Sequence, residues 1–177
     1  VLLVVDPALV QMGLAEPVVA SLQEVGHDVE VFADLHSDPS EGSVDAATKM
    51  AHEMHTNCVV GLGGGSAMDA AKVVAVLTDQ GDACAPFRLG EIPLPFRKTG
   101  LICMPTTAGT GSETTGTSII SQSNGVKNWF WGSQLKPDLA LMDPELTLGL
   151  PPYWTFFTGM DALVHAIESR TNRYRFE

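Results

Sequence analysis

The sequence predicts an α/β protein in which helices cover both faces of a doubly wound, mainly parallel sheet. Short apolar runs alternate with segments of helical periodicity, which is the pattern of βαβ units. The apolar runs, such as residues 1–5, are continuous and do not alternate with polar residues, as is typical of strands buried on both faces. A glycine cluster directly follows one of these runs and precedes a helical segment.

The first half of the chain repeats a strand and a helix three times. Asp6-Pro7 ends the first apolar run, and Gly26 is a stop signal for the first helix. Ser66 suits the N-cap of the third helix, and Asp69 lies three residues later, which predicts a capping box with Asp in place of Glu. The expected strands are residues 1–5, 29–32 and 58–60, and the expected helices are residues 8–25, 43–55 and 67–77.

The second half continues the sheet and then becomes helical. Residues 81–100 carry three prolines and no clear period, so we interpret them as a surface excursion. Asn124-Gly125 is a turn signal, which predicts a β-hairpin over residues 118–131. Further strands are expected at residues 101–104, 117–121 and 139–142. We place a domain boundary near Leu150, with an α/β domain over residues 1–150 and the beginning of a helical domain over residues 151–177.

Composition excludes several classes of protein. The chain has 177 residues and a formal net charge of −11. It has no basic stripe, so we expect no nucleic-acid partner. Its apolar runs are far too short for a membrane span, so we expect no membrane partner. The three widely spaced cysteines and the absence of a signal peptide predict free thiols and a cytoplasmic location. The start inside an apolar run suggests a piece of a longer chain.

The first candidate binding site is the glycine cluster between the third strand and the third helix. Gly63, Gly64 and Gly65 would let a phosphate approach the backbone at a helix start, where N–H groups lack partners within the helix. The dinucleotide fingerprint Gly-x-Gly-x-x-Gly is matched except at its sixth position, which is Ser66. The alternative is a tight turn with a capped helix and no ligand.

A second candidate loop, residues 105–113, also follows a strand. Its sequence PTTAGTGSE offers the hydroxyls of Thr106, Thr107, Thr110 and Ser112 to phosphate or ribose oxygens. It is not a Walker A loop, because no lysine follows the last glycine. A flexible surface loop is the alternative. Two such loops at the carboxyl ends of neighbouring strands favour nucleotide binding, since open α/β sheets bind ligands there.

The candidate metal ligands are Asp161 and His165. Their spacing of four places both on one face of a helix, and a carboxylate with an imidazole suits Zn²⁺ or Fe²⁺. Two ligands are too few for a site, and no later histidine exists in the chain. The alternative is that Asp161 stabilises the helix N-terminus and His165 lies in the core. His52 and His55 fall on a polar helix and are expected in solvent.

Four motifs together resemble the iron-containing (group III) alcohol dehydrogenase family. They are GGGSAMDAAK at residues 63–72, PTTAGTGSE at 105–113, LMDPELTLGLPP at 141–152 and TGMDALVHAIE at 158–168. They occur in the family's order and span nearly the whole chain. The second and fourth motifs are specific, whereas the first alone is not.

The resemblance implies a fold and a set of roles. It implies a Rossmann-like, dehydroquinate synthase-like dinucleotide-binding domain followed by an all-helical metal domain. Asp161 and His165 would be the first two of four ligands to Fe²⁺ or, alternatively, Zn²⁺. The residues implied to contact NAD or NADP are Gly63, Gly64, Gly65, Ser66 and Asp69 at the pyrophosphate, Thr106, Thr107 and Thr110 nearby, and Lys127 at the ribose.

The chain departs from the family pattern in two places. The family's other two ligands are histidines further along, and this chain ends at Glu177 before them. Many members have Asp directly after the phenylalanine of the second strand, where it selects NAD, whereas here that residue is Ala33 and Asp34 follows. Residues 170–177 also match the family poorly.

The implied activity is hydride transfer between NAD or NADP and a metal-bound small alcohol or aldehyde. The full-length protein would be a homo-oligomer, and the chain alone is expected to be inactive. Maleylacetate reductase and glycerol dehydrogenase are neighbouring possibilities within the superfamily. The alternative to an enzyme is a fragment that binds a nucleotide without catalysing a reaction.

Overall fold

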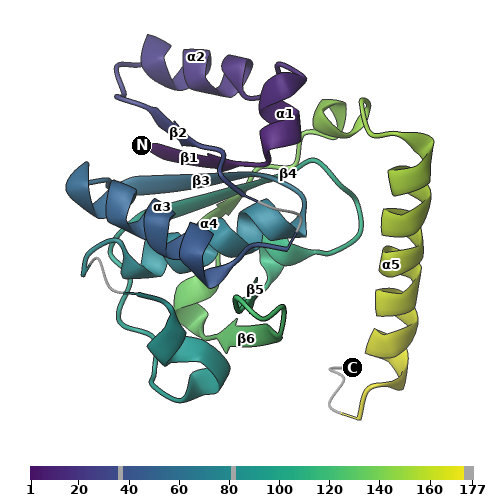
Figure 1. The fold of residues 1–177 in the computed structure, drawn as a ribbon. Helices are drawn as coiled ribbons and strands as arrows, with labels where there is room; N and C mark the ends of the chain where they lie inside the picture. The colour runs from purple at the N-terminus through teal and green to yellow at the C-terminus, as the bar shows by residue number, and fades with distance from the viewer. Residues whose placement is uncertain (36–37, 81–82, 174–177) are drawn as a thin grey trace.

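A five-stranded parallel sheet forms the centre of the computed structural model, which describes residues 1–35, 38–80 and 83–173 (Figure 1). The strand order is β2-β1-β3-β4-β7, and each neighbouring pair runs parallel. This confirms the predicted doubly wound α/β fold. The strands are β1 (Leu2–Val5), β2 (Glu30–Phe32), β3 (Cys58–Gly63), β4 (Gly100–Pro105) and β7 (Leu139–Ala140).

Helices cover both faces of the sheet (Figure 1). One face packs against α1 (Pro7–Gln11) and α2 (Glu16–Glu24), and the other against α3 (Glu41–Glu53) and α4 (Gly65–Leu77). The chain passes from β1 to β2 on one side and then returns to β3 on the other. The order therefore reverses between β1 and β3, and such a reversal opens a crevice at the carboxyl ends of the strands.

The predicted single helix over residues 8–25 is wrong, because the segment forms two helices. Asp6 caps the first of them, accepting a hydrogen bond from the Ala8 N–H at 2.8 Å. Gly13 then adopts a left-handed conformation with φ of +74°, which ends α1 before α2 begins at Glu16. Apolar residues recur at helical spacing on both sides of this break, so periodicity alone did not reveal it.

The glycine-rich stretch also differs from its prediction. β3 runs on to Gly63, because Gly61 and Gly63 pair with Cys103 and Pro105 of β4. α4 begins at Gly65 with Gly64 as its N-cap and has no side-chain cap. The predicted capping box of Ser66 and Asp69 is therefore wrong. The predicted strand over residues 139–142 is also shorter, since β7 pairs only with Ile102 and Cys103.

The predicted hairpin is confirmed. β5 (Thr117–Ser121) and β6 (Lys127–Trp131) pair antiparallel on the far side of α4 from the main sheet (Figure 1). The Ser121 N–H donates to the Pro39 carbonyl at 2.8 Å, which brings residues 38–40 to the hairpin. Short 3₁₀ segments complete the connections at Ala85–Gly90, Ser112–Thr114, Ser133–Leu135 and Pro144–Thr147. Residues 81–82 of the predicted surface excursion lie outside the described residues.

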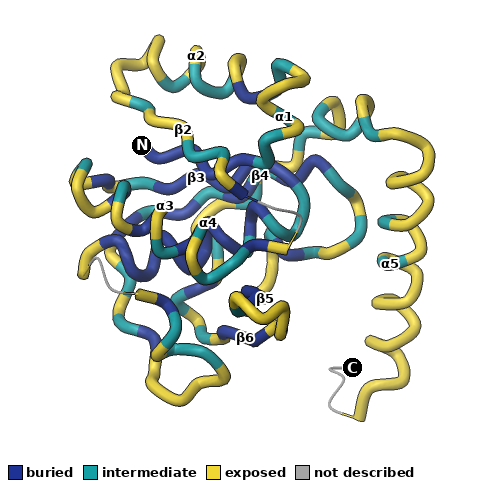
Figure 2. Tube along the Cα trace, viewed as in Figure 1, coloured by how far each residue is buried: buried dark blue, intermediate teal, exposed yellow. Residues whose placement is uncertain are grey.

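The last helix, α5 (Pro152–Thr171), stands beside the rest of the molecule and buries none of its residues (Figure 2). It confirms the predicted change to helix after residue 151. Residues 174–177, which were expected to continue the helix, lie outside the described part. Among the described residues, no helix has the length and apolarity to cross a bilayer.

The three cysteines are free thiols, as expected. Burial raises the pKa of Cys84 and Cys103, to about 12 for Cys103, so both remain protonated at neutral pH. These two thiols therefore belong to the packing of the core.

Candidate functional site

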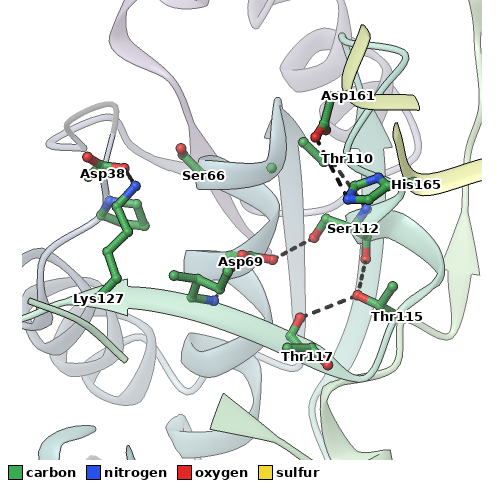
Figure 3. A pocket seen from close by; sticks show the side chains of 13 residues that line it. Asp38, Ser66, Asp69, Thr110, Ser112, Thr115, Thr117, Lys127, Asp161 and His165 are labelled. Carbon is green, nitrogen blue, oxygen red and sulfur yellow. Dashed lines mark hydrogen bonds and ion pairs between the residues drawn. The ribbon is translucent and has the colours of Figure 1, made fainter. Parts of the chain in front are cut away.

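A pocket of about 520 Å³ lies where the glycine turn, the threonine-rich loop, the β5–β6 hairpin and α5 meet (Figure 3). Its position at the carboxyl ends of β3 and β4 is where parallel sheets bind ligands. The predicted site residues that line it are Gly65, Ser66, Asp69, Thr110, Lys127, Asp161 and His165. Segments more than a hundred residues apart in sequence therefore form one site.

The start of α4 forms one wall of the pocket. Gly64 is the N-cap and has no side chain that could bond to the first N–H groups of the helix. Gly65 faces the threonine-rich loop closely, because a Cβ atom at this position would lie 3.0 Å from the Thr110 Cγ2 atom. The absence of a side chain at Gly65 thus lets the two loops approach each other.

Four predicted cofactor residues lie outside this pocket. Gly63 is buried in β3 with φ of +148°, and its carbonyl accepts the Thr106 N–H at 2.9 Å, which ties the two strand ends together. Gly64 is covered by Thr107. Thr107 lines a second hollow of about 270 Å³, and its hydroxyl is buried with no hydrogen-bond partner among the described residues.

Asp69 lines the pocket, but its carboxylate is engaged by the protein. One oxygen accepts the Ser112 hydroxyl at 2.6 Å, and the other accepts the Ile119 N–H at 3.0 Å. Burial raises the pKa of Asp69, and the neighbouring Lys72 opposes that shift. The side chain predicted to face the pyrophosphate therefore bonds to the loop and the hairpin.

Lys72 was not assigned a role from the sequence. Its side chain is fully buried, and burial lowers its pKa while the Asp69 carboxylate opposes that change. The available signal was a single lysine among the small apolar residues of a helix, three positions after an aspartate.

Lys127 pairs with Asp38 on one side of the pocket, with 2.6 Å between the Nζ atom and a carboxylate oxygen (Figure 3). Asp38 reaches this place because the Pro39 carbonyl is bound by Ser121 at the end of β5. The role of Asp38 was missed, and no local motif in the sequence signals it.

Asp161 and His165 point toward the pocket from one face of α5 (Figure 3). The Asp161 carboxylate lies 3.7 Å from the His165 Nε2 atom, and the two side chains are 44% and 51% exposed. The alternative that His165 lies in the core is therefore wrong. The other ring nitrogen, Nδ1, lies 3.3 Å from the Gly109 carbonyl.

Asp161 and His165 are ligands of a type that binds a divalent metal, but two ligands are too few for a complete site. An imidazole nitrogen and a carboxylate oxygen are ligands that both Zn²⁺ and Fe²⁺ accept. Across residues 1–35, 38–80 and 83–173, no third His, Cys, Asp or Glu side chain joins them in a cluster. The pair can thus occupy two positions of a metal site.

The chain is similar in sequence to known proteins over most of its length. The family model for iron-containing alcohol dehydrogenase matches residues 1–144. Long-chain-alcohol dehydrogenase 1 of Geobacillus thermodenitrificans is 37% identical over 171 residues, covering 96% of this chain and 43% of the relative. The 4-hydroxybutyrate dehydrogenase of Cupriavidus necator is 40% identical over 171 residues, covering 95% of this chain and 44% of the relative.

A solved structure shows the same fold. Sulfoacetaldehyde reductase from Bifidobacterium kashiwanohense, in complex with NAD⁺, superposes with a TM-score of 0.88 at 35% identity, over 95% of this chain and 44% of that one. The chain thus spans less than half the length of these relatives. The match of the family model over most of the sequence confirms the resemblance seen in its motifs, and the chain belongs to the iron-containing alcohol dehydrogenase family.

Proposed function

We propose that the whole protein is an oxidoreductase that transfers a hydride between a nicotinamide dinucleotide and a small alcohol or aldehyde. One observation carries the proposal: two strand-end loops and the Asp161–His165 pair line the same pocket. The relatives support it, since they are named as alcohol dehydrogenases and reductases, and one was solved with NAD⁺. A cofactor phosphate and a substrate oxygen would be held within one hollow.

The residues of the α/β part would bind and orient the dinucleotide. The start of α4 offers backbone N–H groups and the positive end of a helix dipole to a pyrophosphate. Gly65 lets Thr110 lie close against the start of the helix, and both residues line the pocket that would receive the pyrophosphate. The Thr107 hydroxyl, which has no hydrogen-bond partner among the described residues, is a further donor just after the end of β4. Lys127 would reach a ribose oxygen after leaving Asp38.

Asp161 and His165 would hold the metal, Fe²⁺ or Zn²⁺. When bound, the metal polarises the substrate oxygen and the nicotinamide exchanges the hydride. The Gly109 carbonyl favours a proton on the His165 Nδ1 atom, which leaves Nε2 as the ligand atom beside the Asp161 carboxylate. The threonine-rich loop thereby orients a metal ligand as well as the cofactor.

The proposed organisation has two units. Residues 1–150 would form the dinucleotide-binding domain, and residues 151–177 would begin a helical metal domain. The absence of any buried residue in α5 supports this division, because the helix has no core of its own in the described structure. We further propose that the whole protein is a cytoplasmic homo-oligomer.

The test uses the whole protein, with NADH and NADPH titrations and elemental analysis. We expect one Fe or Zn per chain and loss of activity on chelation. His165→Ala should lose metal and turnover together but keep cofactor affinity, because the phosphate-binding loops remain intact. His52→Ala is the matched control, since His52 is exposed and bonds to the Thr78 carbonyl away from the pocket. Turnover in the His165→Ala variant would remove this residue from the site.

The 177-residue chain alone gives a separate prediction. A catalytic metal site needs about three protein ligands and an open position, and the described residues bring two together. The chain should therefore bind Fe²⁺ or Zn²⁺ weakly or not at all and should not oxidise alcohols. Tight, stoichiometric metal in this chain would mean that the ligand set is wrong.

The second candidate function is nucleotide binding without catalysis. It is favoured because the described residues bring together only two side chains that could ligate a metal, Asp161 and His165. The intact mass of the native protein and its metal content separate the two candidates. A longer chain with stoichiometric metal supports the oxidoreductase, and a 177-residue chain that binds NADH without metal supports the binding module.

A further inference from the structure

Lys72 is among the largest fully buried side chains of the described structure and is the basis of this inference. It lies in the middle of α4, whose other buried residues are small or apolar. Lysine is almost never fully buried unless its charge is paired, because removing an ammonium group from water costs several kcal/mol. The partners of Lys72 therefore indicate what it does.

The Lys72 ammonium lies within hydrogen-bonding distance of four oxygens. One belongs to Asp69, one turn earlier on the same helix, at 3.4 Å. The other three belong to a single remote segment: the Ser112 hydroxyl at 2.8 Å, the Thr115 hydroxyl at 3.1 Å and the Thr117 carbonyl at 2.9 Å. The lysine thus joins α4 to the connection between the threonine-rich loop and β5.

Asp69 also bonds to this segment, at Ser112 and at residues 118 and 119. Its carboxylate accepts the Ser112 hydroxyl and the Ile119 N–H, at 2.6 and 3.0 Å. Its backbone carbonyl accepts the Ser118 hydroxyl at 2.7 Å. The ion pair therefore fixes residues 112–119 by bonds that run both to side chains and to the backbone.

This segment is continuous with the walls of the pocket (Figure 3). The Ser112 N–H donates to the Thr110 hydroxyl at 3.3 Å. Thr110 in turn packs against Gly65 at the start of α4. The adjacent Gly109 carbonyl lies 3.3 Å from the His165 ring. A displacement of Ser112 would consequently move both the phosphate-binding wall and the partner of His165.

Stability alone gives little reason for a buried ion pair at this position. Replacing such a pair with apolar side chains is often neutral or stabilising, whereas removing one partner is strongly destabilising. A methionine at residue 72 would fill similar space in an apolar helix. The pair instead provides directional bonds that select one arrangement of the loop, which an apolar side chain cannot do.

We propose that Lys72, together with Asp69, is a positioning residue for the cofactor-binding loop: it holds residues 110–119 against the start of α4 so that Thr110 and Gly109 face the bound dinucleotide and His165. The proposal rests on the dinucleotide-binding function proposed above. In it, Asp69 acts through the loop and does not contact the pyrophosphate.

The experiment compares Lys72→Met, the double variant Asp69→Asn/Lys72→Met, and Leu77→Ala. Leu77, the buried last residue of α4, is a control for lost stability at the end of the helix away from the loop. Each protein is titrated with NADH and NADPH, unfolded in urea, and followed by amide hydrogen exchange over residues 110–121.

We expect Lys72→Met to exchange faster in this segment and to bind NADH about tenfold more weakly or worse, as misplacement of a binding group predicts. The double variant should recover stability, since no unpaired charge remains, but should keep the fast exchange and weak binding. If the single variant does not fold, the double variant still tests the proposal. Leu77→Ala should lose stability while its loop exchange and its affinity remain those of the wild type.

Wild-type exchange in the double variant would overturn the proposal, and so would wild-type NADH affinity. Affinity that follows the free energy of unfolding across all three variants would also overturn it, because Lys72 would then act only on stability. A wild-type protein that binds neither NADH nor NADPH would contradict the proposed function. The exchange comparison would still decide, in that case, whether Lys72 holds the loop.

Discussion

At the scale of single residues, two adjacent glycines of the pocket face different surroundings. A Cβ atom at Gly64 would lie 3.5 Å from Thr107, which is ordinary contact, and its backbone conformation is one that any residue adopts. A Cβ atom at Gly65 would lie 3.0 Å from Thr110, so the loop would have to move. The position that demands glycine for close approach is therefore Gly65.

This difference predicts the effect of two matched substitutions. Gly65→Ala should weaken NADH binding about tenfold, because overpacking of roughly 1–3 kcal/mol displaces the Thr110 wall. Gly64→Ala should change the affinity by no more than about twofold, since its methyl group fits. Calorimetric titration of both variants measures this. Equal losses at the two positions would contradict the assignment of the wall to Gly65 and Thr110.

A second prediction at this scale concerns the choice of cofactor. Ala33 is half-buried directly after β2, at the strand end where a carboxylate commonly binds a ribose 2′-hydroxyl. Ala33→Asp should raise the preference for NAD over NADP by roughly tenfold, because the carboxylate accepts the 2′-hydroxyl and repels a 2′-phosphate. Affinities for both cofactors in the two proteins give the ratio. An unchanged ratio would place Ala33 away from the ribose.

At the scale of secondary-structure elements, one ion pair braces the edge of the sheet. Arg97 donates to both oxygens of Asp138, at 2.7 and 2.9 Å, and also to the carbonyls of Thr99, Gln134 and Lys136. Asp138 accepts the N–H of Leu101 at 2.8 Å. The brace joins the connection before β4 to the residues that lead into β7.

The brace predicts a pH dependence of stability. Hydrogen bonds from Arg97 hold the pKa of Asp138 below its usual value, so its contribution is present above the unfolded-state pKa, about 4. It is lost as the pH falls through the lower folded-state pKa.

Asp138→Asn should lower the free energy of unfolding at neutral pH by about 1 kcal/mol, an estimate reduced for solvent screening because the side chain is 57% exposed. The melting temperature should fall by about 2–4 °C. Melting curves from pH 7 to pH 2 should converge for the two proteins at the acid end. A constant difference at all pH values would contradict the role of the Asp138 charge.

At the scale of the whole molecule, α5 exposes many apolar side chains along its length. Its aromatic and aliphatic side chains include Phe156 at 63% and Ile167 at 56% exposure. Apolar patches of this kind mark surfaces that associate with protein. The 177-residue chain should therefore self-associate through α5 as its concentration rises.

Sedimentation velocity over a range of concentrations tests this expectation. Replacing Phe156 and Ile167 by Gln should weaken self-association by about tenfold, because apolar anchors dominate the energy of such contacts. Glu168→Gln, an exposed polar change on the same helix, serves as the control and should leave association unchanged or slightly stronger. A chain that stays monomeric at every concentration would show that α5 does not mediate self-association.

Features that arise from neighbouring residues could be predicted from the sequence. The continuous run at β1 identifies a buried strand, and Asn124-Gly125 identifies the hairpin. The spacing of Asp161 and His165 places them on one face of α5, because a helix has a fixed period. The order strand, glycine turn, helix likewise places Gly65 and Ser66 at the start of a helix, where they line the pocket. Each of these depends on backbone geometry over a few residues, so the local pattern contains the information.

Tertiary structure alone decided which of these groups meet. Asp69 looks like half of a capping box, but in the folded chain it bonds to Ser112 and Ile119, more than forty residues away. Lys127 looks like a surface lysine, and it meets Asp38 only because β5 draws residues 38–40 to the hairpin. The partners of a charged side chain are set by how strands and helices pack, and no periodicity within a segment records that packing.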